Sequence, residues 1–281
     1  MTISGAAMLA GVAGWPIGHS LSPALHGYWI AEHKLDAAYV PLAIAPDGFA
    51  DAFKALPKLG FRGLNVTLPH KEAAFRLVDE RDQTAEATGA VNTVVFEGGR
   101  ALGRNTDVSG FAASLSEGGV SSLFSKNAVV LGAGGAARGV IAGLFLLGAE
   151  HVHLVNRTRQ KADVLAAHFG AQVTPHPWAA LPELLASTRL LVNTTSLGMI
   201  GQSPLEIDLK PLRSGTVADI VYRPLETPLL HQARMQGLRA IDGLGMLLHQ
   251  ARPGFAAWFG VEPKVSAGLR KHLVSILEGR R

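Results

Sequence analysis

The sequence predicts an α/β protein built from two α/β domains, and two observations carry this prediction. Apolar runs alternate with helical stretches along the 281 residues, of which 48% are hydrophobic and 17% charged, as is typical of buried parallel sheets. One alternation, residues 127–169, holds a glycine cluster directly after an apolar run, whereas the region before it has none. We therefore expect a first domain of residues 1–106, a second of residues 107–241, and C-terminal helices within 242–281 that pack back on the first and complete it.

Composition excludes several classes of protein. The 26 Lys and Arg against 22 Asp and Glu give a net charge of +4 without a run of like charges, so a nucleic-acid partner is not indicated. The absence of cysteine excludes disulfides and thiolate ligands, and the eleven histidines lack metal-site spacing, so no metal is expected. With no apolar run of about 18 residues and no basic leader, we expect no membrane partner and a cytoplasmic location.

The glycine cluster indicates a dinucleotide site. Gly132, Gly134 and Ala137 match G-x-G-x-x-(G/A) between an apolar run and a helical stretch, which is the context that this fingerprint requires. Glycines let the backbone approach a pyrophosphate, and the helix N-terminus stabilises its charge. A glycine turn without a ligand is the alternative, and the flanking strand and helix disfavour it. The second domain is therefore predicted to be Rossmann-like.

The end of the next apolar run favours NADP over NAD. About 24 residues after Gly132, an NAD-binding chain carries an acid for the ribose hydroxyls. This chain has Asn156, Arg157 and Thr158 there. An acid would repel a 2′-phosphate, whereas the planar guanidinium of Arg157 can pair with it.

Two further strands are expected at Leu190–Val192 and Val217–Tyr222. Because ligands of open α/β sheets bind at the carboxyl ends of strands, Asn193, Thr194 and Tyr222 are placed to line the cofactor crevice. Polar residues are also common at strand ends without any ligand, so position alone leaves both interpretations open.

The stretch NVTLPHK, residues 65–71, leads from a strand into a helix that begins near Lys71. The helix dipole disfavours a cation there. Alternation sets Asn65 and Thr67 on one face of the strand and three apolar side chains on the other, Leu64, Val66 and Leu68. A solvated surface strand and the wall of a cleft both fit this pattern.

Three polar positions in the first half have both a structural and a functional interpretation. In HSLSPALH, Ser22 before Pro23 fits a helix N-cap and leaves Ser20 free, while two hydroxyls at a helix start also suit a carboxylate. Asp107 lies near a helix start, where it could simply cap the helix. Asn92 is expected in a strand, to which asparagine is poorly suited, so a turn or a ligand would explain it.

In chain order, the motifs Ser-x-Ser-Pro, N-V-T-x-P-x-K, A-V-N-T, N-T-D-x-x-G, G-A-G-G-A-A, N-R-T, N-x-T-S-x-G-M and G-x-G-M-L-x-x-Q resemble the shikimate dehydrogenase family. The resemblance runs from about Gly14 to Gly260. It implies an N-terminal substrate domain, a Rossmann-like NADP-binding domain and NADPH-dependent reduction of 3-dehydroshikimate to shikimate, on the route to chorismate and the aromatic amino acids. It implies small-molecule partners and a monomer or homodimer. Gly27 departs from the family, in which many members have Asn after the motif His.

The resemblance also implies roles for individual residues. Lys71 is the catalytic acid/base or, alternatively, stabilises alkoxide charge and orients the substrate, and Asp107 is its partner. The helix start favours the neutral amine of Lys71 and Asp107 favours the cation, so the resting charge is left open. Ser20 and Ser22 hold the substrate carboxylate. The other expected substrate-binding residues are Asn65, Thr67, Asn92, Tyr222 and Gln250. The expected cofactor-binding residues are Gly132, Ala133, Gly134, Gly135, Ala136, Asn156, Arg157, Thr158, Lys161, Asn193, Thr194, Ser196, Gly243 and Met246.

Three rivals remain at this stage. A quinate/shikimate dehydrogenase using NAD is disfavoured by the serine pair and Arg157. A non-catalytic metabolite sensor could lose Lys71 or Asp107, and both are present. A nucleotide-binding module of other purpose does not explain the Ser-x-Ser and Gln250 motifs.

Overall fold

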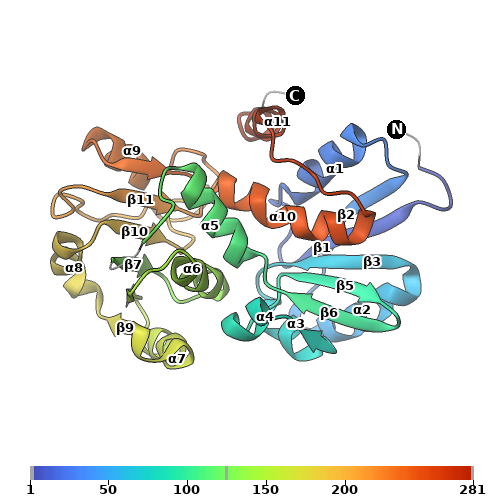
Figure 1. Cartoon of the computed structure of the whole chain (residues 1–281), viewed down its shortest axis with the longest axis horizontal. Coiled ribbons are helices and arrows are strands. Elements are labelled where there is room, and N and C mark those ends of the chain that lie inside the picture. The colour runs from blue at the N-terminus through green and yellow to red at the C-terminus, as the bar shows by residue number, and fades with distance from the viewer. Residues whose placement is uncertain (1–2, 124–125, 280–281) are drawn as a thin grey trace. The chain divides into compact units, whose positions relative to one another are not determined.

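The computed structural model describes residues 3–123 and 126–279, whose strands form two six-stranded sheets in two compact units. The first unit contains the chain up to Thr106 and again from Leu248, and the second contains Asp107–Leu247 (Figure 1). The chain therefore passes from the first unit to the second and back again. Among the described residues, no helix combines the length and the hydropathy that crossing a membrane requires.

The sheet of the first unit has the order β2-β1-β3-β5-β6-β4. Strand β1 is parallel to β2 and β3, β5 is antiparallel to β3 and β6, and β4 is parallel to β6. The strands are β1 (Met8–Gly14), β2 (Ala37–Ala43), β3 (Phe61–Val66), β4 (Glu80–Arg81), β5 (Thr93–Glu97) and β6 (Arg100–Arg104). The helices are α1 (Ser22–Glu32), α2 (Phe49–Ala55), α3 (Lys71–Leu77), α4 (Gln83–Thr88), most of α10 (Leu244–Phe259), and α11 (Ala267–Leu277).

The C-terminal helices return to the first unit, as the sequence predicts: α10 packs on the sheet and α11 contacts α1. Trp258 of α10 donates from Nε1 to the Val94 carbonyl at 2.9 Å, and a Cβ at Gly63 would lie 1.9 Å from that same Nε1. Glycine is therefore required at position 63, because the indole occupies the space of a side chain. Helix α1 covers the same face, since the rings of Trp29 and Phe255 lie 5.3 Å apart. Phe49, Phe53 and Ala74 of α2 and α3 form a core with Leu64 and Val66.

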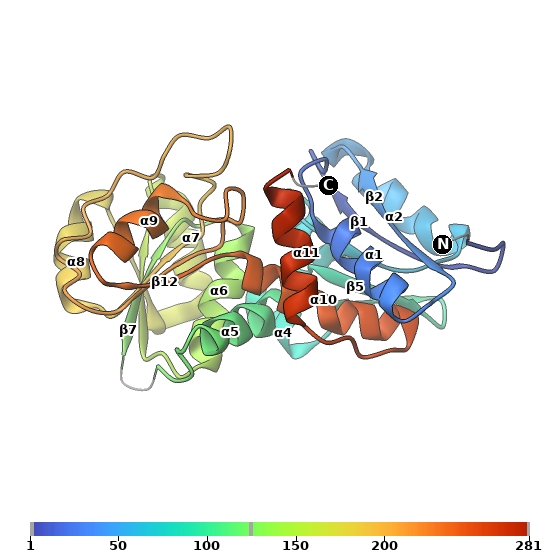
Figure 2. The same ribbon diagram turned by 90° about the horizontal axis from the view of Figure 1, so that it is seen from above.

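The sheet of the second unit is parallel throughout, in the order β12-β11-β10-β7-β8-β9. Read from the other edge, this is the 3-2-1-4-5-6 order of a doubly wound dinucleotide fold. Helices α5, α6 and α7 supply the core on one face and α8 and α9 on the other (Figure 2). The strands are β7 (Asn127–Leu131), β8 (His151–Val155), β9 (Val173–His176), β10 (Leu190–Asn193), β11 (Thr216–Asp219) and β12 (Arg239–Ile241). The helices are α5 (Asp107–Glu117), α6 (Gly135–Leu146), α7 (Arg159–Phe169), α8 (Leu181–Ser187) and α9 (Pro228–Met235).

Three details of the sequence prediction are wrong. Strand β3 ends at Val66, so Leu68 lies beyond the core and is 69% exposed, whereas Leu64 and Val66 are buried as expected. Asn92 precedes β5 and does not lie within it. Strand β11 ends at Asp219, which places Tyr222 in the following loop. At Leu68 and Tyr222 the expected strand is longer than the observed one, whereas Asn92 lies one residue before β5 and still bonds to Val66 and Arg104 of its neighbours.

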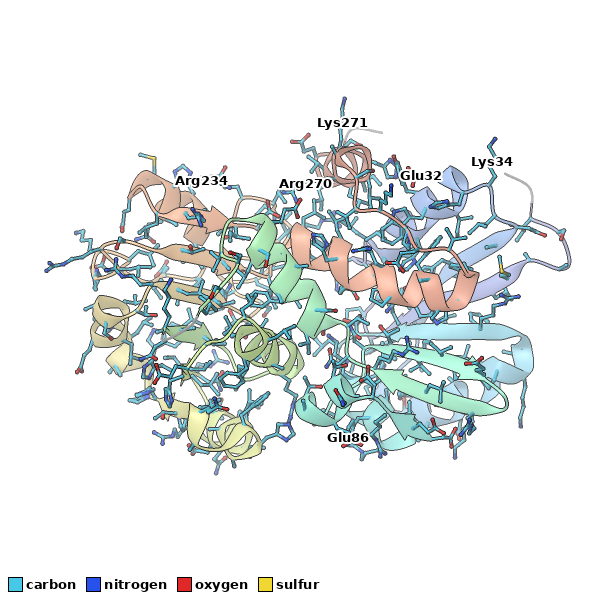
Figure 3. The ribbon with its side chains drawn as sticks, viewed as in Figure 1. Glu32, Lys34, Glu86, Arg234, Arg270 and Lys271 are labelled. Atoms are coloured by element: carbon cyan, nitrogen blue, oxygen red, sulfur yellow. The ribbon has the colours of Figure 1, made fainter. Side chains whose placement is uncertain are left out.

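Most charged side chains lie on the surface. Lys34 and Lys271 extend outward from the ribbon (Figure 3), and Glu86 and Arg234 are also exposed. Exposed ion pairs such as Arg159 with Asp163, at 2.7 Å, add little stability because water screens them.

Candidate active site

In the first unit, the chain after β3 places Thr67 against β1. The Thr67 N–H donates to the Ala13 carbonyl at 2.9 Å, and a Cβ at Gly14 would lie 2.6 Å from the Thr67 methyl group. Glycine at 14 thus permits close approach of the two strand ends. Thr67 is half-buried, and its carbonyl accepts from the His70 N–H at 2.9 Å, which forms the turn into α3.

Lys71 is the first residue of α3, as predicted, and its backbone is held firmly. The buried His70 precedes it and donates from Nε2 to the Ile44 carbonyl at 2.7 Å, while its ring stacks on Phe49 at 4.2 Å. The Lys71 carbonyl accepts from the Val91 N–H at 3.0 Å. A half-buried lysine with a fixed backbone has a restricted set of positions for its ammonium group.

The two serines of HSLSPALH have roles opposite to those expected at the helix start. Helix α1 begins at Ser22 itself and its N-cap is Leu21, so the prediction that Ser22 caps the helix is wrong. The Ser20 hydroxyl accepts from the Ser22 N–H at 3.2 Å, which satisfies one backbone donor of the first turn. Ser22 is buried and its hydroxyl remains available for side-chain contacts, whereas Ser20 is half-buried.

Asn65 and Asn92 form a buried polar cluster. Asn65 donates from Nδ2 to the Asn92 carbonyl and to Thr93 Oγ1, each at 3.1 Å. Asn92 accepts at Oδ1 from the Thr106 N–H at 2.8 Å and faces Gln250 with its own Nδ2, 3.4 Å from Oε1. Asn65, Asn92 and Gln250 are each less than 9% exposed. The polar side of β3 at Asn65 therefore does not meet bulk water, which removes the solvated-strand interpretation there.

Asp107 directly follows Thr106 and is the first residue of α5, buried at 5% exposure. Its position at the helix start agrees with the sequence prediction. Lys71 belongs to the first unit and Asp107 to the second. Their pairing stays a prediction.

In the second unit, the glycine turn meets the turn after β10 at the point where the strand order reverses. Gly132 has φ +99°, and a Cβ there would lie 2.8 Å from Thr194 Oγ1, so both its backbone and its surroundings require glycine. Thr194 donates to the Leu131 carbonyl from its backbone N–H at 2.8 Å and from its hydroxyl at 2.7 Å. Thr194 thus fixes the turn that begins at Gly132.

No contact among the described residues requires glycine at position 134. A glycine there fits a bound dinucleotide, because the absent side chain leaves room for the ligand. Gly134 is exposed, has φ −95°, and a Cβ there would meet nothing within 4 Å. It is the N-cap of α6 and supplies no side-chain cap, so the first backbone N–H groups of α6 can bind a pyrophosphate. The neighbouring Ala133, Gly135 and Ala136 are half-buried.

The turn after β8 presents positive charge. Asn156 donates from Nδ2 to the Thr158 carbonyl at 2.8 Å, which shapes the turn, and Thr158 is the N-cap of α7. Arg157 and Lys161 are exposed. This arrangement suits a 2′-phosphate and offers no carboxylate for ribose hydroxyls.

Asn193 is fully buried and all its hydrogen-bonding groups are used inside the unit. Its amide donates to Asp219 at 2.9 Å and to the Leu197 carbonyl at 3.3 Å, and its Oδ1 accepts from the Thr195 N–H at 3.0 Å and hydroxyl at 2.7 Å. Asn193 therefore supports the turn that carries Thr194 and the exposed Ser196.

The structure places three further expected site residues, Gly243, Met246 and Tyr222, in different environments. A Cβ at Gly243 would lie 2.2 Å from the Ile220 carbonyl oxygen, so packing alone requires this glycine. Met246 is buried in the core with α5 and α6, and Tyr222 is half-buried. Their contacts with ligands stay predictions.

Burial raises the pKa of Asp219 from 3.8 to about 6, although hydrogen bonds from the Val221 N–H, Thr227 and Asn193 oppose the shift. The folded chain therefore holds this proton more tightly than the unfolded chain. The protonated Asp219 therefore contributes to the free energy of unfolding. This contribution is complete below about pH 4, is lost as the pH rises through about 6, and amounts to at most about 3 kcal/mol.

Asp219→Asn is expected to flatten this part of the pH dependence, because the amide cannot ionise. Its oxygen can accept from Val221 and Asn193, and its NH₂ can donate to Thr227. Urea unfolding between about pH 4 and pH 7 measures the change, with Asp208→Asn, at an exposed position of the same unit, as control. A stability curve parallel to that of the wild type would contradict the assignment.

Sequence reasoning missed four residues of these clusters. Thr93 and Thr106 lie inside the A-V-N-T and N-T-D motifs, where adjacency to Asn92 and Asp107 was the available signal. Asp219 ends an apolar run, and a buried acid there signals a partner. Tyr39 donates to Asn65 Oδ1 at 2.6 Å, and a tyrosine in an apolar strand generally signals a hydrogen-bond partner.

A doubly wound parallel sheet, a glycine turn at its switch point and a basic turn after the second strand define a dinucleotide-dependent oxidoreductase class. Residues 12–94 match the shikimate dehydrogenase substrate binding domain, and residues 114–204 match shikimate / quinate 5-dehydrogenase. The chain belongs to the shikimate dehydrogenase family.

Relatives and solved structures agree with this membership. The chain is 54% identical over 280 residues to shikimate dehydrogenase (NADP(+)) of Acidiphilium cryptum, covering 99% of this chain and 100% of the relative. It is 53% identical over 275 residues to the enzyme of the same name from Rhodospirillum rubrum, covering 95% and 97%. A crystal structure of a shikimate dehydrogenase in complex with NADP⁺ superposes with TM-score 0.90, 32% identity and 98% coverage of both chains.

Proposed function

We propose that the chain is an NADP-dependent shikimate dehydrogenase, which reversibly reduces 3-dehydroshikimate to shikimate. Two features of the second unit support the assignment of NADP as cofactor. Gly134 leaves open space at the N-terminus of α6, and Arg157 follows β8. The relatives from Acidiphilium cryptum and Rhodospirillum rubrum are named as NADP(+) enzymes. When bound, NADPH supplies the hydride that reduces the substrate ketone.

Residues of the first unit would hold the substrate. Ser20 and Ser22, at the start of α1, offer hydroxyls to the carboxylate, and Thr67 offers a half-buried hydroxyl to a ring oxygen. Asn65, Asn92 and Gln250 are pre-ordered in one buried cluster, which reduces the entropy lost on binding. Tyr222 completes the proposed substrate set.

Lys71 would transfer the proton to the oxygen that becomes the alcohol, with Asp107 as its partner. Reduction of a ketone places negative charge on this oxygen, so a nearby ammonium both stabilises the charge and can donate the proton. In the direction of shikimate oxidation, the amine accepts the hydroxyl proton. Location in the cytoplasm and a monomeric or homodimeric state remain predictions from the sequence.

Initial rates with shikimate or quinate, each paired with NADP⁺ or NAD⁺, test this function. We expect shikimate with NADP⁺ to lead in kcat/KM by about a hundredfold, or about 2.7 kcal/mol of transition-state discrimination. Comparable rates with quinate and NAD⁺ would favour a quinate/shikimate dehydrogenase instead. Four silent pairs would contradict dehydrogenase activity.

A further inference from the structure

Tyr39, on strand β2, donates to Asn65 of the proposed substrate-holding residues, although no motif contains it. Its side chain is buried at 8% exposure, with its ring stacked on His26 at 3.9 Å and 7° and lying 6.0 Å from Trp258. Burial raises the pKa of Tyr39 well above its usual value of 10.0 and lowers that of His26 to about 3. Both rings are therefore neutral near pH 7, and the phenol keeps its hydrogen.

The direction of the hydrogen bonds around Asn65 follows from one partner that can only accept. The Asn92 carbonyl oxygen, 3.1 Å from the Asn65 side chain, fixes the facing atom as Nδ2. The second amide hydrogen goes to Thr93 Oγ1 at 3.1 Å, so Oδ1 faces Tyr39. Because Oδ1 can only accept, the Tyr39 hydroxyl must donate to it across the 2.6 Å contact.

We propose that Tyr39 is a positioning residue of the substrate site: its hydroxyl fixes the orientation of the Asn65 side chain, which is proposed to bind a ring hydroxyl of the substrate. This inference rests on the proposed function. Within the described residues, both amide hydrogens of Asn65 have acceptors and its oxygen accepts from Tyr39, so three hydrogen bonds fix the orientation of the amide.

Tyr39→Phe tests this role, because the ring that stacks on His26 is kept and the hydroxyl is lost. We expect kcat/KM for shikimate to fall about tenfold while KM for NADP⁺ changes by less than about twofold. Tyr28→Phe is the matched control. Tyr28 lies on α1 in the same unit, with its ring 5.3 Å from His272 and away from Asn65, and its variant should retain wild-type kinetics.

A double-mutant cycle separates positioning from simple structural support. If Tyr39 acts through Asn65, Tyr39→Phe should lower kcat/KM by less than about twofold in the Asn65→Ala background. An equal loss in both backgrounds, unchanged kinetics, or a loss shared with Tyr28→Phe would overturn the inference. If Asn65→Ala does not fold, the Kd of shikimate is measured for Tyr39→Phe and Tyr28→Phe instead. Weaker binding in Tyr39→Phe alone supports the role of Tyr39, and equal Kd values overturn it. A silent wild type would overturn the proposed function itself, whereas an active wild type with unaffected Tyr39→Phe overturns only the role of Tyr39.

Discussion

Lys71→Ala is expected to lower kcat for shikimate oxidation about a thousandfold, while KM for shikimate changes by less than about threefold. Alanine removes both the proton acceptor and the positive charge at the oxygen that changes its bond order. The loss should appear in kcat because that charge matters most in the transition state. Helix α3 should remain, since alanine favours helices and the Lys71 carbonyl still accepts from Val91.

Lys58→Ala is the control, because Lys58 is an exposed lysine of the same unit outside the proposed site. Its kinetics should match those of the wild type. An unchanged kcat in Lys71→Ala would contradict both the acid/base role and the role in stabilising alkoxide charge. A large rise in KM with unchanged kcat would instead assign Lys71 to ground-state binding.

Arg157→Asp should lower kcat/KM with NADP⁺ by about two powers of ten, mainly through KM, and change kcat/KM with NAD⁺ far less. The substitution removes a planar donor for the 2′-phosphate and puts a negative charge in its place. NAD⁺ has a hydroxyl there, and a carboxylate can accept from it. Initial rates with each cofactor at saturating shikimate measure the ratio.

Arg189→Asp makes the same change of charge at the exposed residue directly before β10, at the amino-terminal end of that strand. It should leave both cofactors unaffected, which separates a local contact from a general effect of charge. If Arg157→Asp weakens NADP⁺ and NAD⁺ equally, the assignment of the 2′-phosphate to this turn is wrong.

The second unit was the more predictable from sequence. Its glycine turn, the strand before it and the helix after it are adjacent in the chain, so the pattern around Gly132 carries the local structure. The missing acid near Asn156 could likewise be read directly. The packing of the C-terminal helices on the first unit was predicted because the last amphipathic stretch has no strand after it.

The first unit shows why the remainder could not be predicted. Whether a serine caps α1 depends on where the first helical turn closes: the pattern Ser-x-Ser-Pro fits a cap at Ser22, but the N-cap is Leu21 and the Ser20 hydroxyl accepts from the Ser22 N–H. Tyr39 reaches Asn65 across β1, which lies between their two strands in the sheet. That strand order is a property of the whole fold and cannot be read from the local sequence. The raised pKa of Asp219 likewise depends on burial among residues from three segments.

The division of the first unit between two separated stretches of chain bears on its biogenesis. The second unit is continuous and can fold as soon as the ribosome has released residues 107–247. The first sheet is synthesised earlier, but until the residues after 247 are made it lacks the indole of Trp258 that fills the space over Gly63 and the Lys264 carbonyl that accepts from Trp29 at 3.0 Å. Its exposed apolar face must wait through the synthesis of the second unit, so the nascent chain carries its main aggregation hazard at the N-terminal end.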